Sequence, residues 1–95
     1  MHTFASHEAQ ANAERLLERI ADAGLPQPEL CHDPDGMVSM DWVFAKDRVL
    51  SLSVGVSAKM AYAWIANGER GSGLVTIRGP KAMQWLAQTI ERVKV

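Results

Sequence analysis

Three consecutive runs of alternating apolar and small or polar residues constrain this fold more than any other feature of the chain. The runs MVSMDWVFA, RVLSLSVGV and MAYAWIA predict strands over about 37–45, 49–56 and 60–66. Most of their large apolar side chains fall on even-numbered positions. Because successive side chains of a strand point to opposite faces, each predicted strand has one apolar face.

The two short turns between these runs predict antiparallel pairing in a consistent register. A three-residue turn at Lys46–Arg48 pairs residue 42 with 52, and a three-residue turn at Ser57–Lys59 pairs 52 with 64. Both turns keep even residues opposite even residues, so the three apolar faces become one. The predicted centre of that face is the row Trp42–Leu52–Trp64.

Helical patterns flank the strands. Apolar residues at helical spacing predict a helix over about 7–23, which ends at Gly24 because prolines follow. Pro80 suits a first helical turn, and the apolar residues after it predict a second helix over about 80–93. The apolar stripe of this second helix consists of Met83, Leu86, Ile90 and Val93, and Trp85 is expected to cover an edge of the sheet.

The remaining segments complete an α+β fold. LVTIR predicts a fourth strand over about 74–78, and LPQPELCHDPDG (25–36) reads as an extended connector that a turn at Asp33–Gly36 closes. The predicted order is α-β-β-β-β-α, with a four-stranded antiparallel meander sheet and both helices packed on one face. Residues 1–95 are expected to form a single domain.

The glycine-rich stretch GERGSG (68–73) is predicted to be a loop between two strands. A phosphate-binding loop leads into a helix N-terminus, and a Walker motif ends in Lys-Ser/Thr, so neither reading applies. Its three glycines are expected to supply the unusual backbone angles of a long hairpin connection. Arg70 in this loop is then expected to lie beside Lys46 and Arg48 and to meet a partner.

Small residues dominate the face opposite the apolar one. Its predicted rows are Val43–Ser51–Ile65, Asp41–Ser53–Ala63 and Ser39–Gly55–Ala61. A solvated sheet face usually carries longer charged side chains, so this composition favours a protein interface, with a different protein or with a second copy. The alternatives are a bland solvated face and a face that a helix or the connector covers.

Composition and charge limit the remaining classes of function. The chain of 95 residues has one cysteine, which excludes an intrachain disulfide. Its first residues lack the pattern of a signal peptide, and no stretch reaches the length of a membrane-spanning helix, so a cytoplasmic protein without membrane contact is expected. Net charge is −1, with −6 in residues 1–45 and +5 in residues 46–95.

Residues suited to metal binding or catalysis do not form a recognisable motif. Cys31, His32 and Asp33 make one short cluster, whereas structural zinc sites need paired clusters. A calcium loop that started at Cys31 would place Trp42 where a bidentate glutamate is required. No metal, cofactor or catalytic residue is therefore expected, and the chain is predicted not to be an enzyme.

A nucleic-acid-binding accessory protein is an alternative. The predicted meander brings Lys46, Arg48 and Arg70 to the same end of the sheet, where Asp47 and Glu69 partly neutralise them. The strand aromatics are predicted to point into the core, so they offer no stacking platform for bases.

The central stretch DWVFAKDRVLSLSVGVSAKMAYAWIANGERGSG resembles small uncharacterised proteins of bacterial and phage mobile elements. The shared features are a Trp-bearing strand, a basic turn and a YAW strand that precedes a glycine-rich turn. Proteins of this background include anti-CRISPRs, so the resemblance implies an inhibitor that binds a bacterial defence complex of the CRISPR-Cas type and blocks it. The chain departs from the strongly acidic DNA mimics among them. A small structural homodimer is the third alternative.

Overall fold

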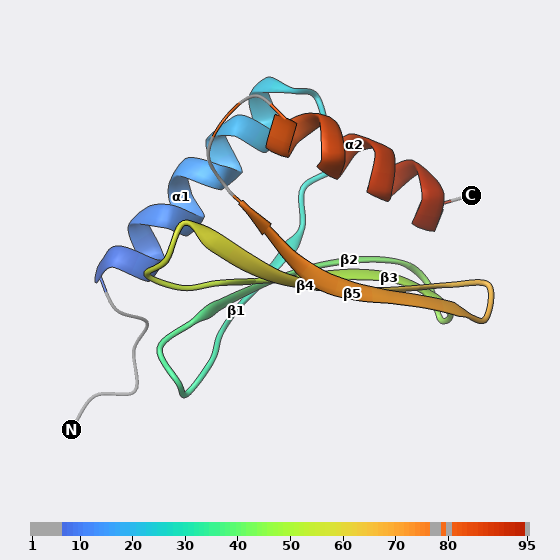
Figure 1. Ribbon diagram of the computed structural model, residues 1–95, viewed down its shortest axis with the longest axis horizontal. Coiled ribbons are helices and arrows are strands. Elements are labelled where there is room, and N and C mark those ends of the chain that lie inside the picture. The colour runs from blue at the N-terminus through green and yellow to red at the C-terminus, as the bar shows by residue number, and fades with distance from the viewer. Residues whose placement is uncertain (1–6, 77–78, 80, 95) are drawn as a thin grey trace.

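The computed structural model describes residues 7–76, 79 and 81–94 (Figure 1). Two helices flank five strands, which pair in the order β1-β2-β3-β4-β5, antiparallel throughout. The elements are α1 (His7–Asp22), β1 (Glu29–His32), β2 (Val38–Ala45), β3 (Arg48–Val54), β4 (Lys59–Ala66), β5 (Glu69–Thr76) and α2 (Lys81–Lys94). The α+β class and the antiparallel meander are confirmed, but the predicted number of strands is wrong by one.

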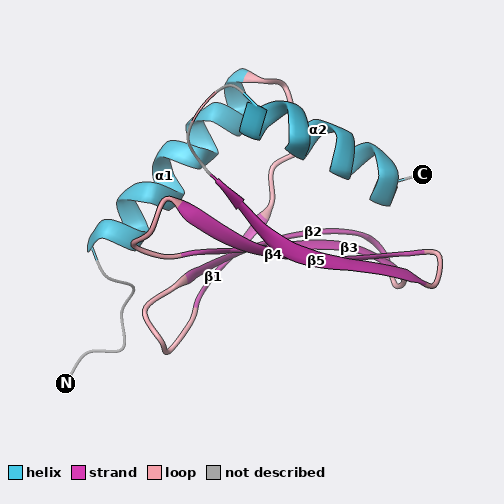
Figure 2. Cartoon of the chain, in the orientation of Figure 1, coloured by secondary structure: helices cyan, strands magenta, loops and turns pink. Residues whose placement is uncertain are grey.

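Both helices pack on one face of the sheet, as predicted (Figure 2). The even-numbered side chains of β2 and β3 point toward the helices, and most are buried, among them Met40, Leu50 and Leu52. The core also takes Leu16 from α1 and Leu86 from α2. These residues fit the predicted apolar stripes, because helical spacing and strand alternation each bring one apolar face to the same layer.

The segment that was predicted to be a connector contains β1. Its residues pair with β2, from Glu29 opposite Asp41 to His32 opposite Val38. The predicted turn closes this hairpin: the Asp33 N–H donates to the Met37 carbonyl oxygen at 2.9 Å, and Gly36 takes a φ of 88°. The strand escaped sequence analysis because ELCH does not alternate apolar and polar residues, and all four of its residues are exposed.

The fourth predicted strand begins earlier than its apolar residues indicate. β5 starts at Glu69, so most of GERGSG is strand and not loop. The turn before it comprises Asn67 and Gly68, whose φ values of 56° and 87° fit the two-residue hairpin turn that Asn-Gly favours. The last two residues of the predicted strand, 77 and 78, lie outside the described residues.

Two glycines of β5 are needed for space and not for backbone angle. Of the three glycines in GERGSG, only Gly68 has a positive φ. A Cβ atom on Gly71 would lie 2.4 Å from ring atoms of Trp64, and one on Gly73 would lie 3.0 Å from the Tyr62 hydroxyl oxygen. The two aromatic rings of β4 therefore lie across the backbone of β5. A side chain at position 71 would collide with Trp64, and one at position 73 would press against Tyr62.

The register differs from the prediction by two residues in each hairpin. The central row is Trp42–Leu50–Trp64. The turn between β2 and β3 has two residues, because Arg48 already belongs to β3, whereas four residues, 55–58, connect β3 to β4. A bulge between Val43 and Ala45 accompanies this turn. A shift of two leaves every side chain on its predicted face, whereas a shift of one would have exchanged the faces.

Candidate protein interface

The face of the sheet opposite the helices, called the outer face below, is built from odd-numbered residues of β1 to β4 and even-numbered residues of β5. Its register differs from the predicted one: Ser51 lies opposite Asp41, and Ser53 lies opposite Ser39. The observed rows are Glu29–Asp41–Ser51–Ala63–Ser72, Cys31–Ser39–Ser53–Ala61–Leu74 and Val43–Val49–Ile65–Arg70. The seven residues predicted for the small-residue face therefore share the outer face: Ser39, Asp41, Ser51, Ser53, Ala61, Ala63 and Ile65.

Within the described ranges, no helix or strand covers the outer face (Figure 2). Three of its large apolar side chains are exposed, with accessible fractions of 58% for Val43, 38% for Ile65 and 68% for Leu74. A shallow depression beside Ile65 is lined by Val49, Ser51, Ala63, Trp64 and Ile65. The side chains at the centre of the face are thus short and uncharged.

Charges of opposite sign mark the two sides of the outer face. Glu29 of β1 and Asp41 of β2 lie opposite each other in neighbouring strands, while Arg70 lies on β5 at the other side of the sheet. Ser39 is less available than its neighbours because its Oγ donates to Asp33 Oδ2 at 2.6 Å. A partner would meet a neutral centre with an acidic side and a basic side.

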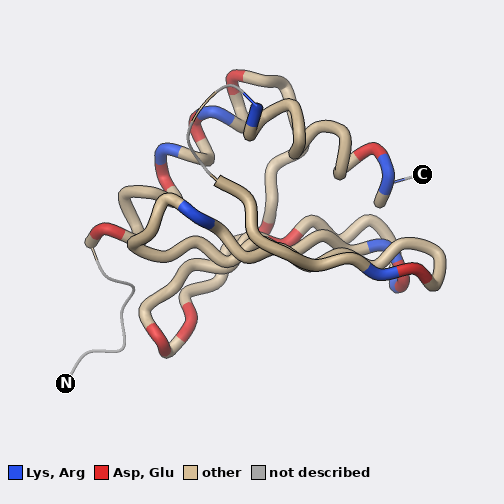
Figure 3. The backbone as a smooth tube through the Cα atoms, in the orientation of Figure 1, with Lys and Arg blue, Asp and Glu red and all other residues tan. Residues whose placement is uncertain are grey.

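The three predicted basic residues share one end of the sheet but not one face (Figure 3). Lys46 is exposed in the turn between β2 and β3. Arg48 lies on the helix side, where its Nη1 donates to the Val93 carbonyl oxygen at 3.2 Å and so caps the C-terminal end of α2. Arg70 lies on the outer face. The sheet therefore separates Arg48 from Arg70.

An aromatic groove, which sequence analysis missed, lies on the helix side. It is lined by Tyr62, Trp64, Trp85, Gln88, Thr89 and Arg92. The Tyr62 and Trp85 ring centroids are 4.8 Å apart at an interplanar angle of 57°, and the Arg92 guanidinium carbon lies 5.7 Å from the Trp64 centroid. The alternation of aromatics in YAW opposite GSG was the signal that could have shown it.

Cys31 is exposed on the outer face. Among residues 7–76, 79 and 81–94, no group of three or more histidine, cysteine or acidic side chains is placed to hold a metal ion. Over the same ranges, no helix combines the length and the apolar character that a membrane crossing requires.

Comparison of the chain with protein-family models, with curated proteins and with solved structures found no match.

Proposed function

We propose that this protein is a non-enzymatic binding module whose outer face docks onto a partner protein. The observation that carries this proposal is the outer face itself, on which no described helix or strand packs, although Val43, Ile65 and Leu74 are exposed on it. Contiguous apolar surface with polar surroundings is typical of protein–protein interaction sites.

The shape of the outer face fits a flat partner surface, such as another sheet or the side of a helix. Ser51, Ser53, Ala61 and Ala63 are short, so a partner backbone can approach closely and bury the neighbouring apolar side chains. The acidic side near Asp41 and the basic side near Arg70 would then fix the orientation of the partner.

The same geometry makes nucleic-acid binding the weaker alternative. A nucleic-acid-binding site gathers its lysine and arginine side chains on one surface, whereas the sheet puts Arg48 and Arg70 on opposite faces. Glu29 and Asp41 on the outer face would repel phosphate groups. The aromatic side chains of β4 that could stack with bases point to the helix side.

A finer proposal is that the partner is a bacterial defence complex of the CRISPR-Cas type, which the protein blocks. Its support is the resemblance of residues 41–73 to small proteins of bacterial and phage mobile elements. In bacteria with an active complex of this type, expression of the protein is expected to restore phage plaque formation. Unchanged plaque counts for the complexes tested would remove those complexes as partners.

Substitution of Ala63 by arginine tests the outer face. Ala63 is exposed at the centre of that face, so the longer charged side chain is expected to weaken partner binding by about 100-fold without unfolding the protein. Gln10→Arg on the exposed side of α1 is the control with the same final residue. Binding to the purified partner measures the effect, and equal loss in both variants would contradict the proposal. Light scattering shows whether the partner is a second copy.

A further inference from the structure

The edge strand β5 is a second unpaired surface, and it lies outside the centre of the outer face. β5 is eight residues long, ends the strand order of the sheet and pairs with β4 without a bulge. Among the described residues, no strand pairs with its outer edge. An edge strand presents a row of backbone N–H and C=O groups, which another extended chain can satisfy by adding a strand.

The aromatic groove borders this edge on the helix side. Gly71 and Gly73 have no side chains there, and the rings of Trp64 and Tyr62 lie across them. Trp85 of α2 forms the other wall of the groove. Side chains of an added strand that point toward the helices would therefore contact aromatic rings directly, because no β5 side chain stands between at these two positions.

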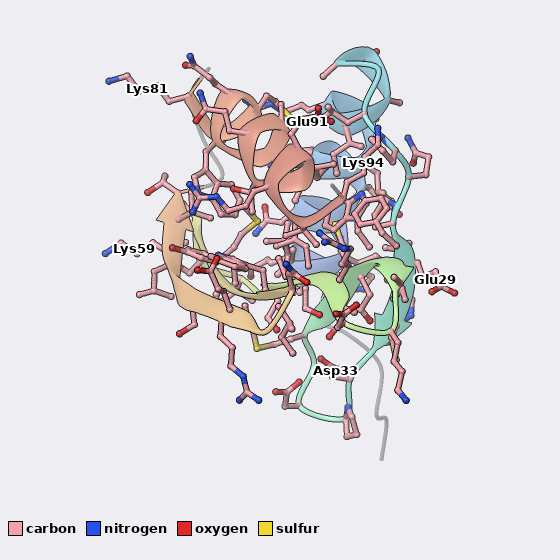
Figure 4. The ribbon with its side chains drawn as sticks, turned by 90° about the vertical axis from the view of Figure 1, so that its right-hand side faces the viewer. Glu29, Asp33, Lys59, Lys81, Glu91 and Lys94 are labelled. Atoms are coloured by element: carbon pink, nitrogen blue, oxygen red, sulfur yellow. The ribbon has the colours of Figure 1, made fainter. Side chains whose placement is uncertain are left out.

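The charge of this region selects the chemistry of the added strand. β4, β5 and α2 together carry five bases and two acids, whereas residues 29–45, which span β1 and β2, carry four acids and no Lys or Arg. Figure 4 shows Lys59 and Lys81 projecting beyond the sheet on the β5 side, with Glu29 on the opposite side. Arg70 adds a base on the outer face of β5 itself.

We infer that β5 and the aromatic groove bind an extended acidic segment of a partner protein as a sixth strand. Its alternate side chains are apolar and enter the groove between β5 and α2. The side chains between them are acidic and meet Arg70 and Lys59 on the outer side. Backbone hydrogen bonds supply affinity that does not depend on sequence, and the groove and the bases select this pattern.

An NMR titration with the capped peptide DVEFDVE tests the inference on the full chain. Chemical-shift changes are expected for the β5 amides and for the indole N–H groups of Trp64 and Trp85. Arg70→Glu is expected to weaken binding at least about tenfold. The matched charge reversal Lys94→Glu, at the exposed C-terminal end of α2, is expected to change it less than about twofold. The peptide KVKFKVK is expected not to bind.

The inference would be overturned by no chemical-shift changes at millimolar peptide, by equal binding of the acidic and basic peptides, or by chemical-shift changes confined to β1. Line broadening of β5 that depends on protein concentration alone would show that a second copy occupies the edge, which also overturns it. Ala63→Arg is expected not to weaken peptide binding, because it adds a base to the face that carries Lys59 and Arg70. Its effect on the peptide therefore differs in direction from the loss expected at the proposed interface. A failed peptide titration with an intact effect of Ala63→Arg would leave only the outer face as a site.

Discussion

Replacement of Leu50 by aspartate is expected to leave the protein largely unfolded, whereas the same replacement of Val49 is expected to leave it folded. Leu50 is fully buried between Trp42 and Trp64 on the helix side. Truncating such a leucine costs about 2–5 kcal/mol, and burying an unpaired carboxylate adds to that loss. The sum approaches or exceeds the stability of about 5–15 kcal/mol that is typical of small domains.

Val49 is the matched control because it is the neighbouring apolar residue and points to the outer face. Its replacement by aspartate is expected to cost about 1 kcal/mol, the range of strand preferences on an open surface. Circular dichroism and urea unfolding measure both variants. Comparable destabilisation of the two in a protein that light scattering shows to be monomeric would mean that the chain itself covers the outer face, which would contradict its assignment as a docking surface.

Gly71→Ala is expected to destabilise the protein by about 2 kcal/mol, a typical effect of overpacking. The new Cβ atom would lie 2.4 Å from the indole ring of Trp64. Because the indole ring is planar and rigid, the whole ring has to move. Displacement of that ring also disturbs its contact with Arg92. Urea unfolding measures the loss of stability, and tryptophan fluorescence reports the movement of the ring.

A double-mutant cycle isolates the cause of that loss. In a Trp64→Ala background the obstructing ring is absent, so Gly71→Ala is expected to cost less than about 0.5 kcal/mol or to stabilise the strand. The same loss in both backgrounds would mean that the glycine serves a backbone conformation, as the sequence alone had suggested, and not the close approach of the ring.

The face to which each strand residue points could be predicted from the sequence, because it depends only on whether the residue number is odd or even. Trp42, Leu50 and Trp64 all lie on the predicted apolar face, although Leu50 and not Leu52 occupies the central row. A displacement of two residues leaves an alternating pattern unchanged, so hydrophobicity alone cannot fix it. The turn at Lys46 and Asp47, with its bulge, decides the register of β2 against β3, and residues 55–58 connect β3 to β4.

The two elements that sequence analysis missed depend on pairing and not on local pattern. β1 has four exposed residues and becomes a strand because its backbone groups pair with β2. The first half of β5 looks like a loop because Gly71 and Gly73 break the apolar alternation. Their function became visible only when the pairing put Trp64 opposite Gly71 and Tyr62 opposite Gly73.

The candidate site was predicted in part. The seven strand residues predicted for the small-residue face, from Ser39 to Ile65, share the outer face, because alternation along the strands placed them there. Gly55, predicted on the same face, is buried and lies after the end of β3. The basic cluster was predicted at one end of the sheet, and Arg48 proved to lie on the helix side. Residues that are close to the same end of a sheet can still point to opposite faces, because side chains alternate along a strand. The contact of Arg48 with Val93 spans 45 positions of sequence, so no local pattern indicates it.

Photo-crosslinking in bacterial cells tests most directly whether the outer face binds a partner protein. A photoreactive phenylalanine derivative at Ala63 is expected to give a discrete heavier adduct, and one at Gln10 on α1 is expected to give none. Excess unlabelled protein is expected to compete the adduct away, and excess Ala63→Arg variant is not. Absence of an adduct at Ala63, the same adducts at both positions, or equal competition by the variant would contradict this account.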